Sequence, residues 1–230
     1  MEEQVIQEVK NKSGRQLPGK IQIVYYTDPL CCWSWAFERH WRKLLKEWKG
    51  KIAWRYCMGG LLPDWKNYND AINAVTRPIQ MGPVWMHAGK MANVPINHRL
   101  WMEDPPASSY PACIAVKCAE LQSAIAGDRY LAFLRQACML QGLNIAKKEV
   151  LLKVASEMVT EFPGLLNLEQ FKKDITGAHG LEAFKKDIQQ AQYQRINRFP
   201  SLVIRKGNQP AILLTGYIPY EVLDNTLHQL

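Results

Sequence analysis

Cys31 is the cysteine best placed to take part in a reaction. It lies in the segment YTDPLCCWSW, residues 26–35, where a predicted strand is followed by a predicted helix. A thiol at a helix N-terminus meets unpaired backbone N–H groups and the positive end of the helix dipole, and both favour the thiolate. In such places a cysteine pKa of about 8.5 falls to roughly 3.5–7.5. We therefore expect Cys31 to be a nucleophile with a lowered pKa. The alternative is a buried structural cysteine.

Short apolar strands and one amphipathic helix must position this thiol. Phe37, Trp41, Leu44, Leu45 and Trp48 recur at helical spacing, which predicts a helix that ends near Gly50. Strands are predicted over residues 21–26, 51–56, 201–204 and 211–214, the last two flanking a loop of hairpin size, and a final helix over 219–230.

The order of these elements is βαβ, a helical middle, then ββα. It predicts an α/β, thioredoxin-like fold with a helical domain inserted in the middle, and a proline, Pro200, opens the third strand. We expect a polar N-terminal arm over 1–20, a thioredoxin-like domain formed by 21–63 and 196–230, and the inserted helical domain over 64–195. A length of 230 residues agrees with one large domain or a domain with an insert.

The segment DPLCxWxW after a strand resembles the active-site loop of the DsbA family, in its cytoplasmic FrnE-like branch. Residues 104–112, 199–202 and 216–220 resemble other segments of that branch. The resemblance implies that the Phe199–Pro200 peptide is cis and faces Cys31. It then leaves the backbone of Phe199 free to pair with an extended substrate or with glutathione. Trp33, inside the loop, is expected to add an apolar rim for binding.

One position departs from the pattern of that family, which has Cys-x-x-Cys. Ser34 occupies the position of the second cysteine, and an alcohol cannot form a disulfide. The resemblance therefore implies a monothiol mechanism in which Cys31 attacks a protein disulfide or a glutathione adduct and an external thiol such as glutathione resolves it. Ser34 could donate a hydrogen bond to the Cys31 thiolate. Cys32 is a possible accessory thiol, although a disulfide between neighbours strains the geometry and favours a packing role.

Two other functions remain open. Related proteins with a helical insert include kappa-class glutathione transferases and 2-hydroxychromene-2-carboxylate isomerases, which place a serine where this chain has Cys31. A different class of function is a non-catalytic adaptor with a degenerate active site, because some cytoplasmic DsbA-like proteins serve as protease adaptors.

Composition excludes several further classes. With 47% hydrophobic and 22% charged residues the chain is expected to fold as a globular protein. The net charge of +8 is spread over several helices, so no nucleic-acid partner is expected. No apolar run is long enough for a membrane span, and the charged N-terminus does not resemble a secretory signal, so a cytoplasmic location is expected. The cysteine and histidine spacings predict no metal site, and no bound cofactor is expected beyond glutathione as a possible co-substrate.

Overall fold

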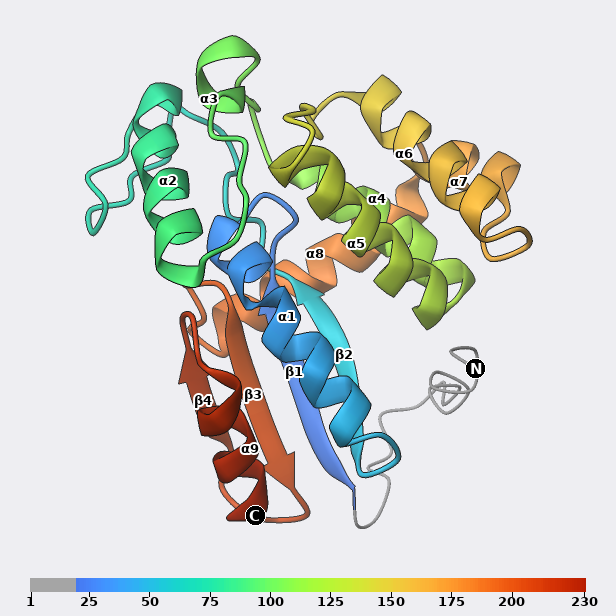
Figure 1. Ribbon diagram of the computed structural model, residues 1–230. Coiled ribbons are helices and arrows are strands. Elements are labelled where there is room, and N and C mark those ends of the chain that lie inside the picture. Colours follow the sequence, from blue (N-terminus) through green and yellow to red (C-terminus); the bar gives the residue numbers. More distant parts are fainter. Residues whose placement is uncertain (1–19) are drawn as a thin grey trace.

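A mixed sheet forms the centre of the protein, and its strands are β1 (Ile21–Thr27), β2 (Ile52–Met58), β3 (Ser201–Lys206) and β4 (Ile212–Thr215). The computed structural model describes residues 20–230, so the polar arm expected over 1–20 lies, except for Lys20, outside the described residues. The strand order is β2-β1-β3-β4, with β1 parallel to β2 and antiparallel to β3 (Figure 1). β1 is therefore an inner strand, which suits its β-branched and aromatic sequence IQIVYYT.

Helices cover both faces of this sheet. The helices α1 (Cys32–Glu47) and α9 (Tyr220–His228) lie on one face, and α8 (Ala178–Tyr193) packs behind it against β2 (Figure 1). The apolar stripe predicted for the first helix is buried, from Phe37 and Trp41 to Trp48 just beyond its end. On β1, the Tyr25 ring packs edge-on against Phe37 and Trp41, with centroid separations of 5.6 and 5.0 Å. This aromatic cluster fixes α1 on the sheet.

The segment between β2 and β3 contains the helical insertion. Figure 1 shows two groups of helices, one on each side of the N-terminal end of α1, so the insert brackets the segment that contains Cys31. The first group is η2 (Pro78–Gln80), a 3-10 helix, with α2 (Met81–Ala92) and α3 (Leu100–Glu103), and the second is α4 (Tyr110–Gln122), α5 (Ala124–Met139), α6 (Lys148–Glu161) and α7 (Leu168–Asp174).

The predicted fold class, a thioredoxin-like α/β fold with a helical insertion, is confirmed. Local sequence sets two helix starts in the insert. α5 begins at Ala124, where the Ser123 hydroxyl accepts a hydrogen bond from the Ala126 N–H and caps the helix. α4 begins at Tyr110, with a proline in its first turn. Within residues 20–230, no helix combines the length and apolarity that a membrane crossing requires.

Candidate functional site

Cys31 is the N-cap residue of α1, where the chain leaves β1 and enters the helix. Its Sγ atom lies 3.4 Å from the backbone nitrogen of Ser34, whose N–H it accepts, and 3.4 Å from the carbonyl oxygen of Phe199, to which the thiol donates. The sequence separates Cys31 and Phe199 by 168 residues. The fold therefore brings together the predicted nucleophile and the predicted substrate-binding backbone.

The lowered pKa expected for Cys31 is wrong. The residue is only 4% exposed, and burial raises the pKa of its thiol above the ordinary value. Hydrogen bonds from the side chain and backbone of Ser34 lower the pKa of the Cys31 thiol, as was expected of the helix N-terminus. Their effect on the pKa is smaller than that of burial. The sequence showed the helix start, whereas the burial comes from residues distant in the chain.

Ser34, at the position of a second active-site cysteine, is fully buried one turn into α1. Its hydroxyl has no hydrogen-bond partner at good geometry among the described residues, and the same holds for the neighbouring Tyr25 hydroxyl. The Ser34 hydroxyl nevertheless lies close enough to the Cys31 sulfur to lower the pKa of that thiol. A buried hydroxyl that donates to no acceptor destabilises the folded state. The Ser34 hydroxyl gains an acceptor when the Cys31 sulfur becomes an anion.

The peptide bond between Phe199 and Pro200 is cis. The Phe199 ring packs on Gly59, where a side-chain carbon would lie 1.9 Å from the ring. The Gly59 N–H in turn donates to the Thr27 carbonyl at 2.8 Å, which extends the pairing of β2 with β1. A side chain at position 59 would therefore displace the Phe199 ring, a constraint that the local sequence pattern does not contain.

Asp28, three residues before Cys31, ties the active-site loop to two other segments. Its carboxylate accepts hydrogen bonds from the backbone N–H groups of Leu30 and Leu61, at 2.8 and 2.7 Å. It also accepts from the Ser109 hydroxyl at 2.8 Å and the Cys113 thiol at 3.3 Å. The carboxyl is fully buried, and burial raises its pKa. This side chain was missed as a functional candidate, although an aspartate before proline is a known turn signal.

A buried ion pair joins α1 to the helical insert beneath the site. The Arg135 guanidinium of α5 is completely buried, pairs with Glu38 of α1 and donates to the Thr27 hydroxyl. Glu38 also accepts from Arg42, which bonds to Asp128 at 2.7 Å. The charges therefore balance, and they clamp the insert to the end of β1. No local pattern in the sequence could have paired residues this far apart.

Aromatic side chains form one rim of the site. Trp33, expected to lie here, is half-buried, with its ring 5.7 Å from that of His87 on α2 and 6.3 Å from that of Tyr217. The Tyr217 hydroxyl lies 2.8 Å from His40 Nε2 and 3.0 Å from the Arg39 guanidinium, which donates to it. Partial burial and the nearby Arg39 lower the pKa of His40. His87 and Tyr217 complete a surface that sequence reasoning assigned mainly to Trp33.

Among residues 20–230, Cys32 forms no hydrogen bond with the aromatic side chains of this rim. It is buried in the main hydrophobic core, and burial raises the pKa of its thiol well above the ordinary value. All six cysteines are free thiols. The position of Cys32 in the core favours the packing role, and it leaves Cys31 as the thiol that contacts the Phe199 loop.

A pocket of about 780 Å³ lies away from Cys31, between β2, α4, α7 and α8. None of the predicted site residues lines it. Its deepest cation, Lys117, is already paired with Glu120 at 2.6 Å and Asp187 at 3.0 Å. The thiol site and this pocket are therefore separate. Among residues 20–230, no group of histidine, cysteine and carboxylate side chains is arranged to hold a metal ion.

Curated relatives cover most of this chain at modest identity. The ClpXP adapter protein SpxH of Halalkalibacterium halodurans is 28% identical over 204 residues, which cover 88% of this chain and 65% of that protein. SpxH of Shouchella clausii is 27% identical and covers 93% of this chain and 69% of its own length. The chain thus spans about two thirds of these relatives.

Solved structures share the fold at lower identity. Cytosolic disulfide reductase DsbM from Pseudomonas aeruginosa aligns with a TM-score of 0.67 and 19% identity, over 91% of this chain and all of that one. A structure of 2-hydroxychromene-2-carboxylate isomerase has a TM-score of 0.60 and 12% identity, over 90% of this chain and 95% of that one. A family model described as Thioredoxin matches residues 25–225. With a strand-to-helix cysteine, a facing proline loop and a match over nearly the whole chain, this protein belongs to that thioredoxin family.

Proposed function

We propose that the protein catalyses thiol–disulfide exchange by a monothiol mechanism, with Cys31 as the nucleophile and a protein disulfide or glutathione adduct as substrate. The observation that carries the proposal is the contact of Cys31 Sγ with both the Ser34 N–H and the Phe199 carbonyl, each at 3.4 Å. In the first contact, the Ser34 N–H donates a hydrogen bond to the thiolate. The second places a backbone segment beside the sulfur, where an extended substrate could pair with it.

The reaction proceeds in two exchanges. The Cys31 thiolate attacks the glutathione sulfur of a protein–glutathione disulfide, forms a Cys31–glutathione disulfide and releases the protein thiolate, which takes up a proton. A second glutathione thiolate attacks the sulfur of that glutathione, releases Cys31 and forms oxidised glutathione. Overall, the protein sulfur is reduced from a disulfide to a thiol, the sulfur of the attacking glutathione is oxidised from a thiol to a disulfide, and the sulfur of the transferred glutathione remains in a disulfide throughout. Ser34 carries no sulfur, so it takes no part in these exchanges except as a hydrogen-bond donor.

Burial of Cys31 slows the first exchange. Because the pKa of the Cys31 thiol is raised, only a minor fraction of it is ionised at neutral pH. Attack therefore depends on the Ser34 N–H and hydroxyl, which stabilise the anion. The reducing cytoplasm expected for this chain would supply glutathione as the resolving thiol. The solved DsbM structures support this choice, since one of them contains GSH.

The test is a deglutathionylation assay with a glutathionylated model peptide and reduced glutathione. Wild type is expected to accelerate release of the free peptide, and Cys31→Ala is expected to abolish the acceleration. Cys32→Ala is the matched control, because it removes an adjacent thiol that lies in the core. Equal activity of wild type and Cys31→Ala would remove the proposed mechanism.

A second candidate is a proteolytic adaptor, and the observation that favours it is the name shared by the two curated relatives above. In that role the buried thiol would be dispensable. The test measures protein half-lives in cells of the source organism that carry the chain, Cys31→Ala or neither, each with and without ClpX. An adaptor shortens the half-life of the same proteins with or without Cys31, only when ClpX is present. If no half-life depends on both the chain and ClpX, the adaptor role fails.

A further inference from the structure

Three exposed cations at the active-site end of the molecule have no anionic partner. Arg39 of α1, Lys90 of α2 and Arg198 before β3 are exposed, and no carboxylate among the described residues lies within salt-bridge distance of them. Some lysines elsewhere are paired, such as Lys172 at 2.6 Å from Glu169, whereas others, such as Lys46 and Lys148, are exposed and form no ion pair among residues 20–230. The three cations are therefore distinguished by their position near the Cys31 segment, not by the lack of an anionic partner.

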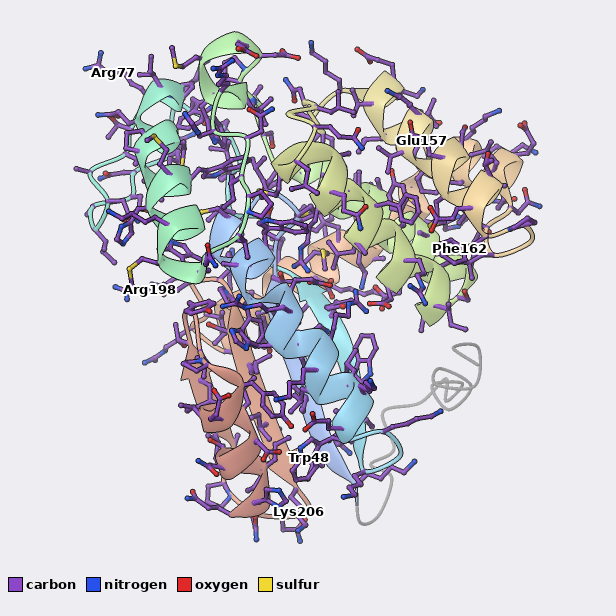
Figure 2. All side chains as sticks on the ribbon, in the orientation of Figure 1. Trp48, Arg77, Glu157, Phe162, Arg198 and Lys206 are labelled. Atoms are coloured by element: carbon purple, nitrogen blue, oxygen red, sulfur yellow. The ribbon has the colours of Figure 1, made fainter. Side chains whose placement is uncertain are left out.

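Each of these cations is linked, by sequence or by a contact, to a residue next to Cys31 or to the aromatic side chains beside it. Arg198 directly precedes Phe199, whose carbonyl contacts the Cys31 sulfur, and Figure 2 shows Arg198 beside the lower end of α2. Arg39 bonds to the Tyr217 hydroxyl at 3.0 Å, and Tyr217 lies against Trp33. Lys90 is three residues after His87, on the same side of α2, and the His87 ring meets Trp33. We name Arg39, Lys90 and Arg198 the cationic rim.

The carboxylates Asp28, Asp70 and Glu221 lie near this end of the molecule. Asp70 accepts hydrogen bonds from the backbone N–H groups of Ile72 and Asn73 and from the Asn73 amide. Asp28 is buried and holds four hydrogen-bond donors, so it presents no charge to the surface. Glu221 is near enough to raise the pKa of His40, against the larger effects of burial and Arg39. Clefts lined by charge of one sign raise the local concentration of ligands of the opposite sign. The rim therefore favours an acidic partner.

An apolar component lies on the same helix as Lys90. Met86 and Met91 of α2 are 54% and 63% exposed, and they flank His87 and Lys90 in sequence. Methionine side chains are flexible and polarisable, so they adapt to many apolar partners. The combination of exposed methionines with unpaired cations fits a segment that has both carboxylates and apolar side chains.

We propose that the cationic rim and the methionines of α2 bind an acidic, partly apolar protein segment that presents the disulfide or glutathione adduct to Cys31. This inference rests on the proposed function for its chemistry and names the substrate class of the same site. Charge complementarity selects the occupant: an acidic polypeptide rather than a neutral apolar one.

The experiment uses three glutathionylated peptides of one length, in which glutamate, glutamine or lysine alternates with leucine around the cysteine. Single-turnover transfer of glutathione to Cys31 is measured at low ionic strength. The glutamate peptide is expected to react about tenfold faster than the glutamine peptide, and the lysine peptide more slowly than both. High salt should remove most of the difference, because it screens exposed charges.

Two triple variants of the full chain locate the effect. Arg39→Gln, Lys90→Gln and Arg198→Gln together are expected to abolish the preference for the glutamate peptide. Lys46→Gln, Lys49→Gln and Lys148→Gln remove the same number of charges, from the far end of α1 and from α6, and should preserve it.

Binding of the same three peptides with serine in place of cysteine is measured in parallel by fluorescence anisotropy. This arm separates the two claims. If no peptide reacts but the glutamate peptide binds most tightly, the chemistry fails and the acidic partner stands. Equal binding of the three peptides by wild type, or an unchanged preference in the rim variant, overturns the acidic partner.

Discussion

At the scale of single residues, the site is a compromise between burial and stabilisation of an anion. Burial of Cys31 opposes ionisation, and the contacts with Ser34 favour it. The position of the sulfur at the helix start was predictable from the strand-to-helix junction. The sign of its pKa shift was not, because the Phe199 loop that covers it follows 168 residues later.

The pH dependence of Cys31 reactivity follows from this balance. A raised thiol pKa means that the ionised fraction keeps growing above neutrality, so the alkylation rate by iodoacetamide should still rise with pH above about 8.5, the pKa of a free cysteine. Ser34→Ala should slow the reaction roughly tenfold at a fixed pH, since it removes a donor to a charged sulfur. Ser156→Ala, which alters an exposed hydroxyl on α6, serves as the control. A rate that levels off below pH 7 would contradict the raised pKa.

Asp28 gives a second pH effect, on stability. Burial raises the pKa of its carboxyl above the unfolded value of about 3.9. Between the unfolded and the folded pKa, the native state therefore binds the proton more tightly than the unfolded state does. The contribution of Asp28 to stability is therefore greatest at low pH and falls as pH rises through its folded pKa. Asp28→Asn cannot ionise.

The free energy of unfolding by urea, measured for both proteins from pH 3 upward, isolates this contribution. The free energy of unfolding of wild type minus that of Asp28→Asn should decrease as the pH rises. An increase of that difference with pH would show that the native state favours the carboxylate.

At the scale of elements, close contacts decide where loops can lie. The strands and the apolar stripe of α1 were predictable, because their periodicity is local. The separate helices α2, α3 and α7 were not delimited. α2 is short and keeps Met86 and Met91 exposed, so its apolar pattern does not mark a single buried face. The constraint on a side chain at position 59 depends on a ring from a distant loop, which local patterns do not contain.

Gly59→Ala tests this contact. Its new carbon would lie 1.9 Å from the Phe199 ring, so the ring and the Pro200 loop must move, and we expect a destabilisation of about 1–3 kcal/mol with slower Cys31 exchange. Gly82→Ala is the matched control, because the nearest atom to its new carbon is 3.9 Å away and the site is helical. The control should be neutral or stabilise by up to about 1 kcal/mol. Equal unfolding free energies for the two variants would show that the Phe199 contact carries no constraint.

At the scale of the whole molecule, the insert is joined to the thioredoxin-like part by buried charge as well as apolar packing. Arg135 reaches from α5 to Glu38 of α1 and to Thr27 at the end of β1. Removing Glu38 leaves Arg135 as an uncompensated buried charge, whereas removing Arg135 leaves Glu38 still paired with Arg42. The two parts should therefore lose stability together when this pair is broken.

A double-mutant cycle checks this expectation. Glu38→Gln should destabilise by about 3–5 kcal/mol, Arg135→Met by less because Glu38 keeps its pair with Arg42, and the double variant by less than the sum of the two. Chemical unfolding followed by far-ultraviolet circular dichroism gives the free energies. Lys153→Met with Glu157→Gln, an exposed pair on α6, is the control and should change stability by less than about 1 kcal/mol. Strict additivity at Glu38 and Arg135 would mean that the buried pair is not coupled.

The most direct test of the account is mass spectrometry of the protein after exposure to oxidised glutathione, with the modified residue located by peptide mapping. The account predicts one glutathione adduct, on Cys31, that is absent in Cys31→Ala and retained in Cys32→Ala. An adduct on another cysteine with Cys31 unmodified, or an intact Cys31 thiol after reaction at alkaline pH, would contradict it.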